Sequence, residues 1–277
     1  MRQTALLFLV ALLFAGGGCR HSKPTIAIDP GEKGADKRMY DNAVRYMNKD
    51  PEKARLLFKE VAQLYPDSIY ANKAKLGIGD SYFRERDSAS LVMAAAEYQE
   101  YVNLYPYSPD AVYAKYQIGM CYFKQVRRPE RDQTNTFAAI KAFEALIQQY
   151  PGTTEAGEAK KKIDECRQTL ATHFYRIGYY NYLLKAYDGA LARFKQVMDE
   201  YPDFRDNAKL LYYTGRTYAD MGDRASALSF FQRVTGSHAR SKFAGKAQKW
   251  IRKLSRPEAG GKKAPPPRPG EAEGAEK

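Results

Sequence analysis

A phrase of alanine, an aromatic residue, an apolar residue and Tyr-Pro recurs along the chain at offsets of 0, 4, 7, 11 and 12. The four full copies are Ala54–Pro66, Ala94–Pro106, Ala139–Pro151 and Ala190–Pro202, and a fifth copy, Ala227–His238, lacks the proline. Offsets of 4, 7 and 11 lie close to multiples of 3.6, so these residues share one face of a helix. Proline then stops the helix, because it has no N–H and disfavours helical geometry in the residue before it.

A second helix is expected before each copy, and a small residue marks it. The marker residues are Asn42, Gly79, Gly119, Gly178 and Gly215. In the fourth and fifth units the glycine lies 12 positions before the alanine. Unrelated amphipathic helices would not reproduce such offsets five times. Self-similarity of this kind predicts a stack of equivalent helix pairs rather than one globule with one active site.

A small residue in a first helix, followed by alanine and an aromatic residue in a second, resembles the tetratricopeptide repeat. The resemblance implies an all-α fold, a superhelical solenoid of about five tetratricopeptide-like helix pairs. We place this solenoid at residues 36–255. A curved stack of helix pairs offers an extended concave surface that suits a peptide or a protein domain.

The repeats are unevenly spaced, and the extra residues mark irregular parts of the stack. In the third unit the glycine and the alanine are 20 positions apart instead of 12, which predicts an insertion near Val126–Thr136. Arg131, Asp132 and Gln133 belong to this insertion. Before the fourth unit, Thr154–Leu170 keeps the helical pattern and predicts a helix that continues into the next one.

The first residues have the order of a secretory signal. Arg2 precedes an apolar run that is too short to span a bilayer, and three glycines and Cys19 follow. Cysteine after three small residues resembles the cleavage site of bacterial lipoproteins. This implies that residues 1–18 are a signal peptide and that Cys19 carries an acyl lipid, while Arg20 implies sorting to the outer membrane. An ordinary signal peptide with an incidental cysteine is the alternative.

Two flanking segments are expected to lack a packed structure. Residues 19–35 contain two prolines and two glycines with little periodicity, and they predict a tether. Residues 256–277 are rich in Gly, Pro and Glu and predict a disordered tail, because this composition cannot bury a core.

The chain is basic, with a formal net charge of +13, and removal of residues 1–18 takes away one arginine and leaves +12. Such a charge favours anionic lipid headgroups or an acidic protein partner. The ordinary use of these Lys and Arg residues, as solvated helix faces, is the alternative. No nucleic acid is expected as the partner of an exported protein.

The 22 tyrosines are a second candidate for binding. Many lie on the first helices of the pairs, where part of the set must fill the core. The rest, with Tyr179, Tyr212 and Tyr213 as candidates, are expected to line a groove, because tyrosine joins a large apolar ring to a polar tip.

Cys121 and Cys166 each lie in a helical pattern, which predicts small buried side chains. A disulfide between them stays open, because the sequence does not show whether they are close in space. The sequence has no His-Glu-x-x-His, no Gly-x-Ser-x-Gly and no phosphate loop. We therefore expect no metal, no cofactor other than the acyl lipid on Cys19, and no enzymatic activity.

Three stretches resemble the BamD family, lipoproteins of the machinery that folds β-barrels into bacterial outer membranes. They are residues 65–71, 131–151 and 170–202. The third is the most specific, because it holds more than its repeat requires, including Arg193 before Phe194.

The resemblance implies a lipid-anchored scaffold on the periplasmic face of the outer membrane. The C-terminal repeats would hold the periplasmic domain of a BamA-like barrel insertase, and the N-terminal repeats would receive the C-terminal segment of unfolded barrel substrates. Other assembly lipoproteins are further partners. The candidate partner-binding residues are Arg131, Asp132, Gln133, Tyr179, Arg193, Tyr212 and Tyr213. A tetratricopeptide lipoprotein adaptor for pilus secretin assembly or envelope division is the alternative, because the repeats alone do not exclude it.

Overall fold

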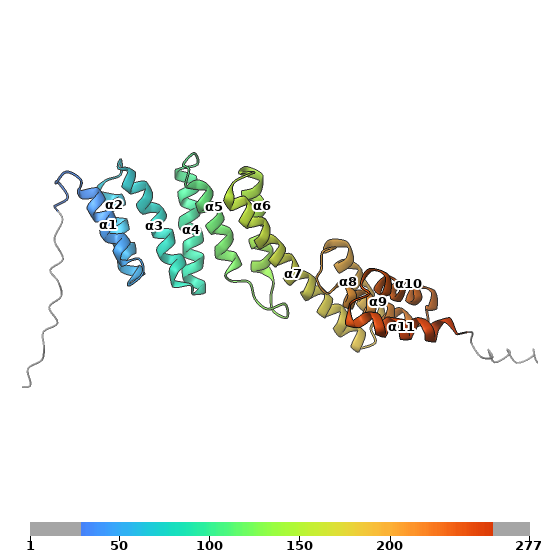
Figure 1. The fold of residues 1–277 in the computed structure, drawn as a ribbon. Coiled ribbons are helices and arrows are strands. Elements are labelled where there is room, and N and C mark those ends of the chain that lie inside the picture. The colour runs from blue at the N-terminus through green and yellow to red at the C-terminus, as the bar shows by residue number, and fades with distance from the viewer. Residues whose placement is uncertain (1–28, 257–277) are drawn as a thin grey trace, which may run out of the picture.

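The computed structural model describes residues 29–256, and its regular structure over this range is helical (Figure 1). The helices are α1 (Ala35–Tyr46), α2 (Pro51–Leu64), α3 (Ile69–Glu85), α4 (Ser88–Leu104), α5 (Ala111–Phe123), α6 (Thr134–Gln149), α7 (Thr154–Leu183), α8 (Tyr187–Glu200), α9 (Asn207–Met221), α10 (Arg224–Ser237) and α11 (Lys242–Ser255). Each helix packs against the next along the chain. The predicted all-α solenoid of five helix pairs is therefore confirmed, with α11 as an additional last helix.

Three predicted segments fall wholly or partly outside the described residues. These are the signal peptide of residues 1–18 with Cys19, most of the tether, and the tail beyond Arg256. Between residues 29 and 256, the structure contains no helix that is both long enough and apolar enough to cross a membrane.

The rings of the repeated phrase fill the space between the paired helices. Phe58, Tyr98, Phe143, Phe194 and Phe231 are all almost completely buried. In four pairs the marker glycine lies directly against this ring. A Cβ atom would come within 2.8 Å of Tyr98 at Gly79, 2.8 Å of Phe194 at Gly178 and 2.9 Å of Phe231 at Gly215, and at Gly119 it would overlap Phe143. At these positions the ring from the second helix occupies the space that a side chain on the first helix would need. The glycine in the sequence pattern therefore allows the two helices to approach closely.

The second helix of each pair ends in the same way. In α2, α4, α6 and α8 the residue after the helix is the tyrosine of Tyr-Pro, with φ between −129° and −131° and ψ between 58° and 62°. His238 after α10 has φ −132° and ψ 42° although no proline follows. The proline therefore reinforces this turn, and the fifth unit reaches a similar end without it.

Helix α7 joins the two halves of the molecule and is 30 residues long (Figure 1). Its first part packs Ile163 and Cys166 against the cluster around Phe143. Its second part packs Ala171 and Tyr175 against the cluster around Phe194, after which α8 to α11 complete the stack. The predicted continuation of Thr154–Leu170 into the next helix is confirmed.

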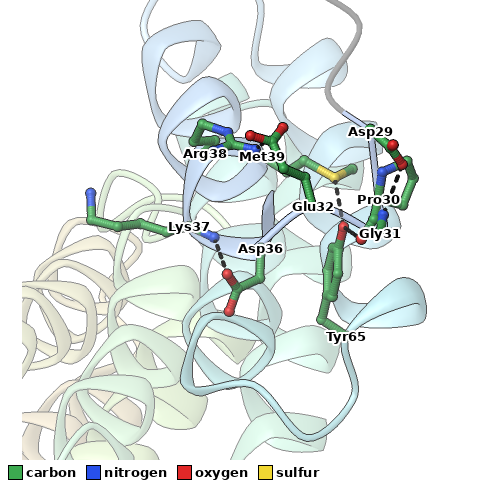
Figure 2. Close-up of polar contacts among 9 residues, drawn as sticks. All are labelled: Asp29, Pro30, Gly31, Glu32, Asp36, Lys37, Arg38, Met39 and Tyr65. Carbon is green, nitrogen blue, oxygen red and sulfur yellow. Dashed lines mark hydrogen bonds and ion pairs between the residues drawn. The ribbon is translucent and has the colours of Figure 1, made fainter. Parts of the chain in front are cut away.

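Residues 29–34 are exposed and touch the first repeat through two contacts (Figure 2). The Tyr65 hydroxyl donates to the Pro30 carbonyl at 2.9 Å, and Arg38 pairs with Glu32 at 2.6 Å. The predicted tether of residues 19–35 thus reaches the start of α1 at Ala35, and Tyr65, which contacts the described end of this segment, is distant in sequence.

Candidate binding surface

The predicted insertion is the loop between α5 and α6, and a buried side chain fixes its shape. Gln133 is 5% exposed, and its amide donates to the carbonyls of Arg128 and Arg131, both at 2.9 Å. Its carbonyl oxygen accepts from the Thr136 hydroxyl at 2.7 Å. Gln133 thus holds the loop from inside, which contradicts its assignment to a partner-binding surface.

The other two candidates in this loop face outward. Arg131 is exposed, and Asp132 is exposed while its carboxylate accepts from the Thr134 hydroxyl at 2.9 Å. Asp132 therefore helps to start α6, since an aspartate before a helix satisfies donors of its first turn. Of the three predicted residues, Arg131 is the one whose side chain remains available on the surface.

The loop is also docked on α7. His173 Nδ1 lies 2.6 Å from the Pro129 carbonyl oxygen, and Glu130 forms an ion pair with Arg176. We call this arrangement the loop clamp. It joins two stretches that the sequence marked separately, the insertion and the segment that begins at Leu170. The histidine had no sequence signal of its own, because its partner is a backbone carbonyl 44 residues away.

Arg193 on α8 lies next to the loop clamp. Its guanidinium is 5.8 Å from the ring centroid of Phe174, and this ring makes an edge contact with His173 at 5.0 Å. The Arg193 side chain is exposed, with a hydrogen bond to Gln196 at 2.8 Å. The exposed charge of Arg193 therefore lies beside a clamp that joins the α5–α6 loop, which carries Arg131, to α7.

The predicted tyrosines lie along the contact between α7 and α9. The rings of Tyr179 and Tyr213 meet edge-to-face at 4.7 Å, and both are partly exposed. Burial raises the pKa of Tyr213 to about 12, so its hydroxyl stays protonated. Tyr182 extends the row, with its ring 5.7 Å from Tyr213 and its hydroxyl donating to Asp220 at 2.9 Å. Such rings offer apolar area with a hydrogen-bonding tip.

Tyr212 does not belong to this surface. It is 6% exposed and packs against Phe231 and Phe243, with ring centroids 5.8 and 5.3 Å away. The prediction that it faces a partner is wrong, because consecutive residues of a helix point about 100° apart and only Tyr213 points to the α7 side.

Exposed apolar side chains extend the tyrosine row to the end of α7. Tyr180, Leu183 and Leu184 are 62%, 57% and 60% exposed. Single exposed apolar residues are common on protein surfaces, and three of them within five residues give α7 an apolar end. Of these three, Tyr180 is one of the first-helix tyrosines from which a groove was predicted, whereas no sequence signal pointed to Leu183 and Leu184.

In the first half, Asp80 on α3 is the polar centre of the interior. Its carboxylate accepts from the hydroxyls of Tyr98 at 2.6 Å and Tyr113 at 2.9 Å. Burial raises the pKa of Asp80, and the two hydrogen bonds oppose this rise. The sequence offered no signal for this residue beyond one carboxylate directly after the glycine that meets Tyr98.

Both cysteines of the described region are buried free thiols, so the disulfide left open by the sequence does not form. Burial raises the pKa of Cys121 to about 12 and that of Cys166 to about 11. Within residues 29–256, no group of three or more His, Cys, Asp and Glu side chains is placed to hold a metal ion.

A regular helix stack, a docked loop and an outward row of aromatic side chains define a helical-repeat scaffold, a class that binds other proteins over extended surfaces. The comparison with known families is consistent with this class. The chain belongs to the YfiO family of outer membrane lipoproteins, whose profile matches residues 32–232. That range begins before α1 and reaches into α10.

Two relatives carry the same name, outer membrane protein assembly factor BamD. The protein from Caulobacter vibrioides is 29% identical over 229 residues, which cover 79% of this chain and 70% of that one. The protein from Rickettsia prowazekii is 26% identical over 263 residues, covering 91% and 98%. The predicted BamD family is confirmed. The solved structure of MamA protein is 16% identical over 82% of this chain and 98% of that one, but its TM-score of 0.32 is too low for a comparison of surfaces.

Proposed function

We propose that the protein is a non-enzymatic lipoprotein scaffold of the outer-membrane β-barrel assembly machinery. It binds the periplasmic domain of a BamA-like barrel insertase, other assembly lipoproteins and unfolded barrel substrates. The observation that carries this proposal is the family match over residues 32–232, joined by two relatives named as assembly factors. The repeat fold is consistent with it, since a helix stack positions surfaces for partners and does not by itself bring catalytic groups together.

The second half of the stack has the composition expected of the insertase site. The row formed by Tyr179, Tyr182 and Tyr213 presents partly exposed rings, and Leu183 and Leu184 add apolar area beside it. Aromatic residues and arginine dominate the binding energy of protein interfaces. The loop clamp keeps this row in a fixed position relative to Arg131 and Arg193.

The first half carries the proposed substrate site. Leu56 on α2 and Val92 and Met93 on α4 are exposed apolar side chains. Arg55 on α2 lies over the Tyr82 ring at 3.9 Å and pairs with Glu85 at 3.1 Å. The exposed apolar residues suit the apolar side chains of an extended segment, whereas Arg55 is already paired and its side chain is only 12% exposed, so its contacts fix α2 against α3.

Depletion of the protein in its host, followed by measurement of barrel proteins in the outer membrane, tests the proposed function. We expect barrel levels to fall before other envelope proteins change. Purification of the protein from detergent extracts should recover a barrel insertase. Recovery of a secretin with unchanged barrel levels would instead support the adaptor function and refute the proposal.

Arg193→Glu tests the surface directly, and Lys195→Glu is its matched control. Both residues are exposed cations on α8, but only Arg193 lies beside Phe174 and the loop clamp. We expect Arg193→Glu to weaken binding of the insertase periplasmic domain at least ~10-fold, as expected when a central interface arginine is lost. Equal loss for both variants would show a nonspecific charge effect.

Cys19→Ala tests the proposed anchor, which lies outside the described residues. Each buried CH₂ of an acyl chain contributes about 0.8 kcal/mol to membrane affinity. We expect the variant to fractionate with periplasmic proteins, whereas retention of the full amount in the outer membrane would contradict lipidation at this residue.

A further inference from the structure

The positive charge of the described region is concentrated at one end of the stack. Residues 29–223 contain 29 basic and 28 acidic residues, a net charge of +1. Residues 224–256, which form α10 and α11, contain nine basic residues and no acidic residue. The bias is therefore a local property of the last two helices rather than a general feature of the surface.

Helix α11 arranges its charges along one side. Lys242, Lys246, Lys249 and Lys253 follow one another at intervals of four, three and four residues, which places them in one stripe of α11, and Arg256 comes directly after the helix. All five are exposed, and Arg252 is exposed next to them. We call these six residues the basic stripe.

The opposite flank of α11 is occupied by the fold itself. Phe243 and Ala247 are buried against α9 and α10, and Trp250, Ile251 and Leu254 pack partly buried on the same cluster. Three lysines of the basic stripe lie over these rings, with the Nζ atoms of Lys242 and Lys246 5.6 and 5.4 Å from the Phe243 centroid and Lys253 Nζ 4.7 Å from the Trp250 centroid. The packing of α11 therefore fixes the direction in which the stripe points.

No carboxylate within the described part of the chain neutralises the stripe. Its six members form no ion pair with any residue from 29 to 256, whereas lysines elsewhere, such as Lys75 and Lys162, do form one. Like charges at intervals of three and four along a helix repel one another and destabilise it slightly. An anionic ligand spread along the stripe would relieve this repulsion.

We propose that the basic stripe binds the anionic headgroups of a phospholipid membrane surface. The charge is of one sign over about 20 Å of helix, given a rise of 1.5 Å per residue, so a mobile layer of headgroups can match it without a fixed register. A protein partner would have to present a continuous acidic face in one register along the helix, because charge patterns across a protein interface are complementary. Membership of a family of outer membrane lipoproteins places such a surface within reach.

This contact has a consequence for orientation. Helix α11 lies at the end of the stack opposite to α1, and the predicted anchor at Cys19 precedes α1 (Figure 1). Membrane contacts at both ends hold the long axis of the solenoid along the bilayer rather than upright on a single tether.

The test uses the mature chain from residue 19 with Cys19→Ser, so that no acyl lipid contributes. Co-sedimentation is measured with vesicles of mixed phosphatidylethanolamine and phosphatidylglycerol and with vesicles of phosphatidylcholine alone. We expect binding to the anionic vesicles only, with loss at high salt, because exposed charges are screened within about 10 Å at 0.1 M salt. Lys242→Gln, Lys246→Gln, Lys249→Gln and Lys253→Gln combined should lower the partition coefficient at least ~100-fold, since each basic residue near an anionic surface contributes about 1 kcal/mol.

The matched control replaces four exposed lysines of the charge-balanced region, Lys59, Lys141, Lys160 and Lys195, with glutamine. It removes the same charge and should keep most of the binding, and thermal unfolding checks that both variants are folded. Equal loss in both variants, equal binding to both vesicle types, or no binding to anionic vesicles would overturn the proposal. The proposal would also be overturned if an acidic protein were captured only when the basic stripe is intact while vesicle binding did not depend on the stripe. Because acylation and insertase binding are absent from this assay, its failure leaves the proposed scaffold function intact.

Discussion

The two halves of the solenoid use the same repeat but have different interiors. In α1 to α6, tyrosine hydroxyls are tied to polar side chains: Tyr98 and Tyr113 donate to Asp80, and Tyr101 donates to Asn72 at 2.7 Å. In α7 to α11, rings pack mainly on other rings. Tyr175 stacks on Phe194 at 5.8 Å, and its buried hydroxyl has no hydrogen-bond partner among the described residues. The repeat thus specifies where an aromatic ring lies, while the neighbouring residues determine whether the ring forms a hydrogen bond or only stacks on other rings.

The halves also differ in how their units are connected. In the first half each helix pair leads to the next through a short turn (Figure 1). In the second half, α7 belongs to two clusters at once, and the loop clamp fastens the preceding unit to it. The second half is therefore tied to the preceding unit by a shared helix and a docked loop, whereas the units of the first half meet through the packing of adjacent helices.

Phe194→Ala is expected to have the largest effect, because it removes a ring from the centre of the second half. Phe194 is completely buried and lies against Gly178. The cavity should lower the free energy of unfolding by about 3–5 kcal/mol, measured by urea denaturation. Phe137→Ala, at a half-exposed site on α6, is the control and should cost much less. A negligible shift for Phe194→Ala would contradict the repeat alignment.

Tyr98→Phe tests the polar interior of the first half. The ring stays in place against Gly79, but the hydroxyl that donates to Asp80 at 2.6 Å is lost. We expect a loss of about 1–3 kcal/mol in unfolding free energy, because the carboxylate keeps only Tyr113 as a donor. If Tyr98→Phe is neutral, the hydrogen bonds of Asp80 do not support the first half and the contrast between the interiors fails.

Asp80→Asn should change how the free energy of unfolding varies with pH more than it changes the free energy of unfolding at any one pH. Burial raises the folded-state pKa of Asp80 above its ordinary value of 3.8, so the folded chain holds this proton more tightly than the unfolded chain. The stability contributed by the protonated carboxyl is fully present below the ordinary pKa, and it is lost as the pH rises through the higher folded-state pKa. Relative to the variant, the natural chain should therefore lose stability as the pH rises from acidic to neutral.

Asp36→Asn is the control for this sign. The Ser68 hydrogen bond lowers the pKa of Asp36, so its contribution is present at neutral pH and lost as the pH falls. For each variant, the difference in unfolding free energy between the natural chain and the variant is plotted against pH. The two plots should have slopes of opposite sign. Parallel slopes would exclude burial of Asp80 as the cause.

Features that depend on the periodicity of the sequence were predicted correctly. Contacts between residues that are distant in the sequence were not. The buried rings, the helix ends at Tyr-Pro, the insertion and the long helix all follow from local offsets, and the structure confirms them. Gln133 and Tyr212 were assigned to a surface and are buried, because one residue along a helix or loop changes the direction of a side chain. Residues of the loop clamp, such as His173, could not be predicted, since their contacts join segments that only the stack brings together.

Tyr175→Phe is expected to have the smallest effect, and it sharpens the comparison because it makes the same chemical change as Tyr98→Phe. The Tyr175 hydroxyl is buried without a partner among the described residues, and burial raises its pKa. A buried polar group that forms no hydrogen bond costs stability, so its removal should leave the unfolding free energy unchanged or raise it by up to about 1 kcal/mol. Urea denaturation of both variants under the same conditions gives the two values side by side. A loss for Tyr175→Phe as large as that for Tyr98→Phe would mean that its hydroxyl is bonded in solution, and the second half would then share the polar interior of the first.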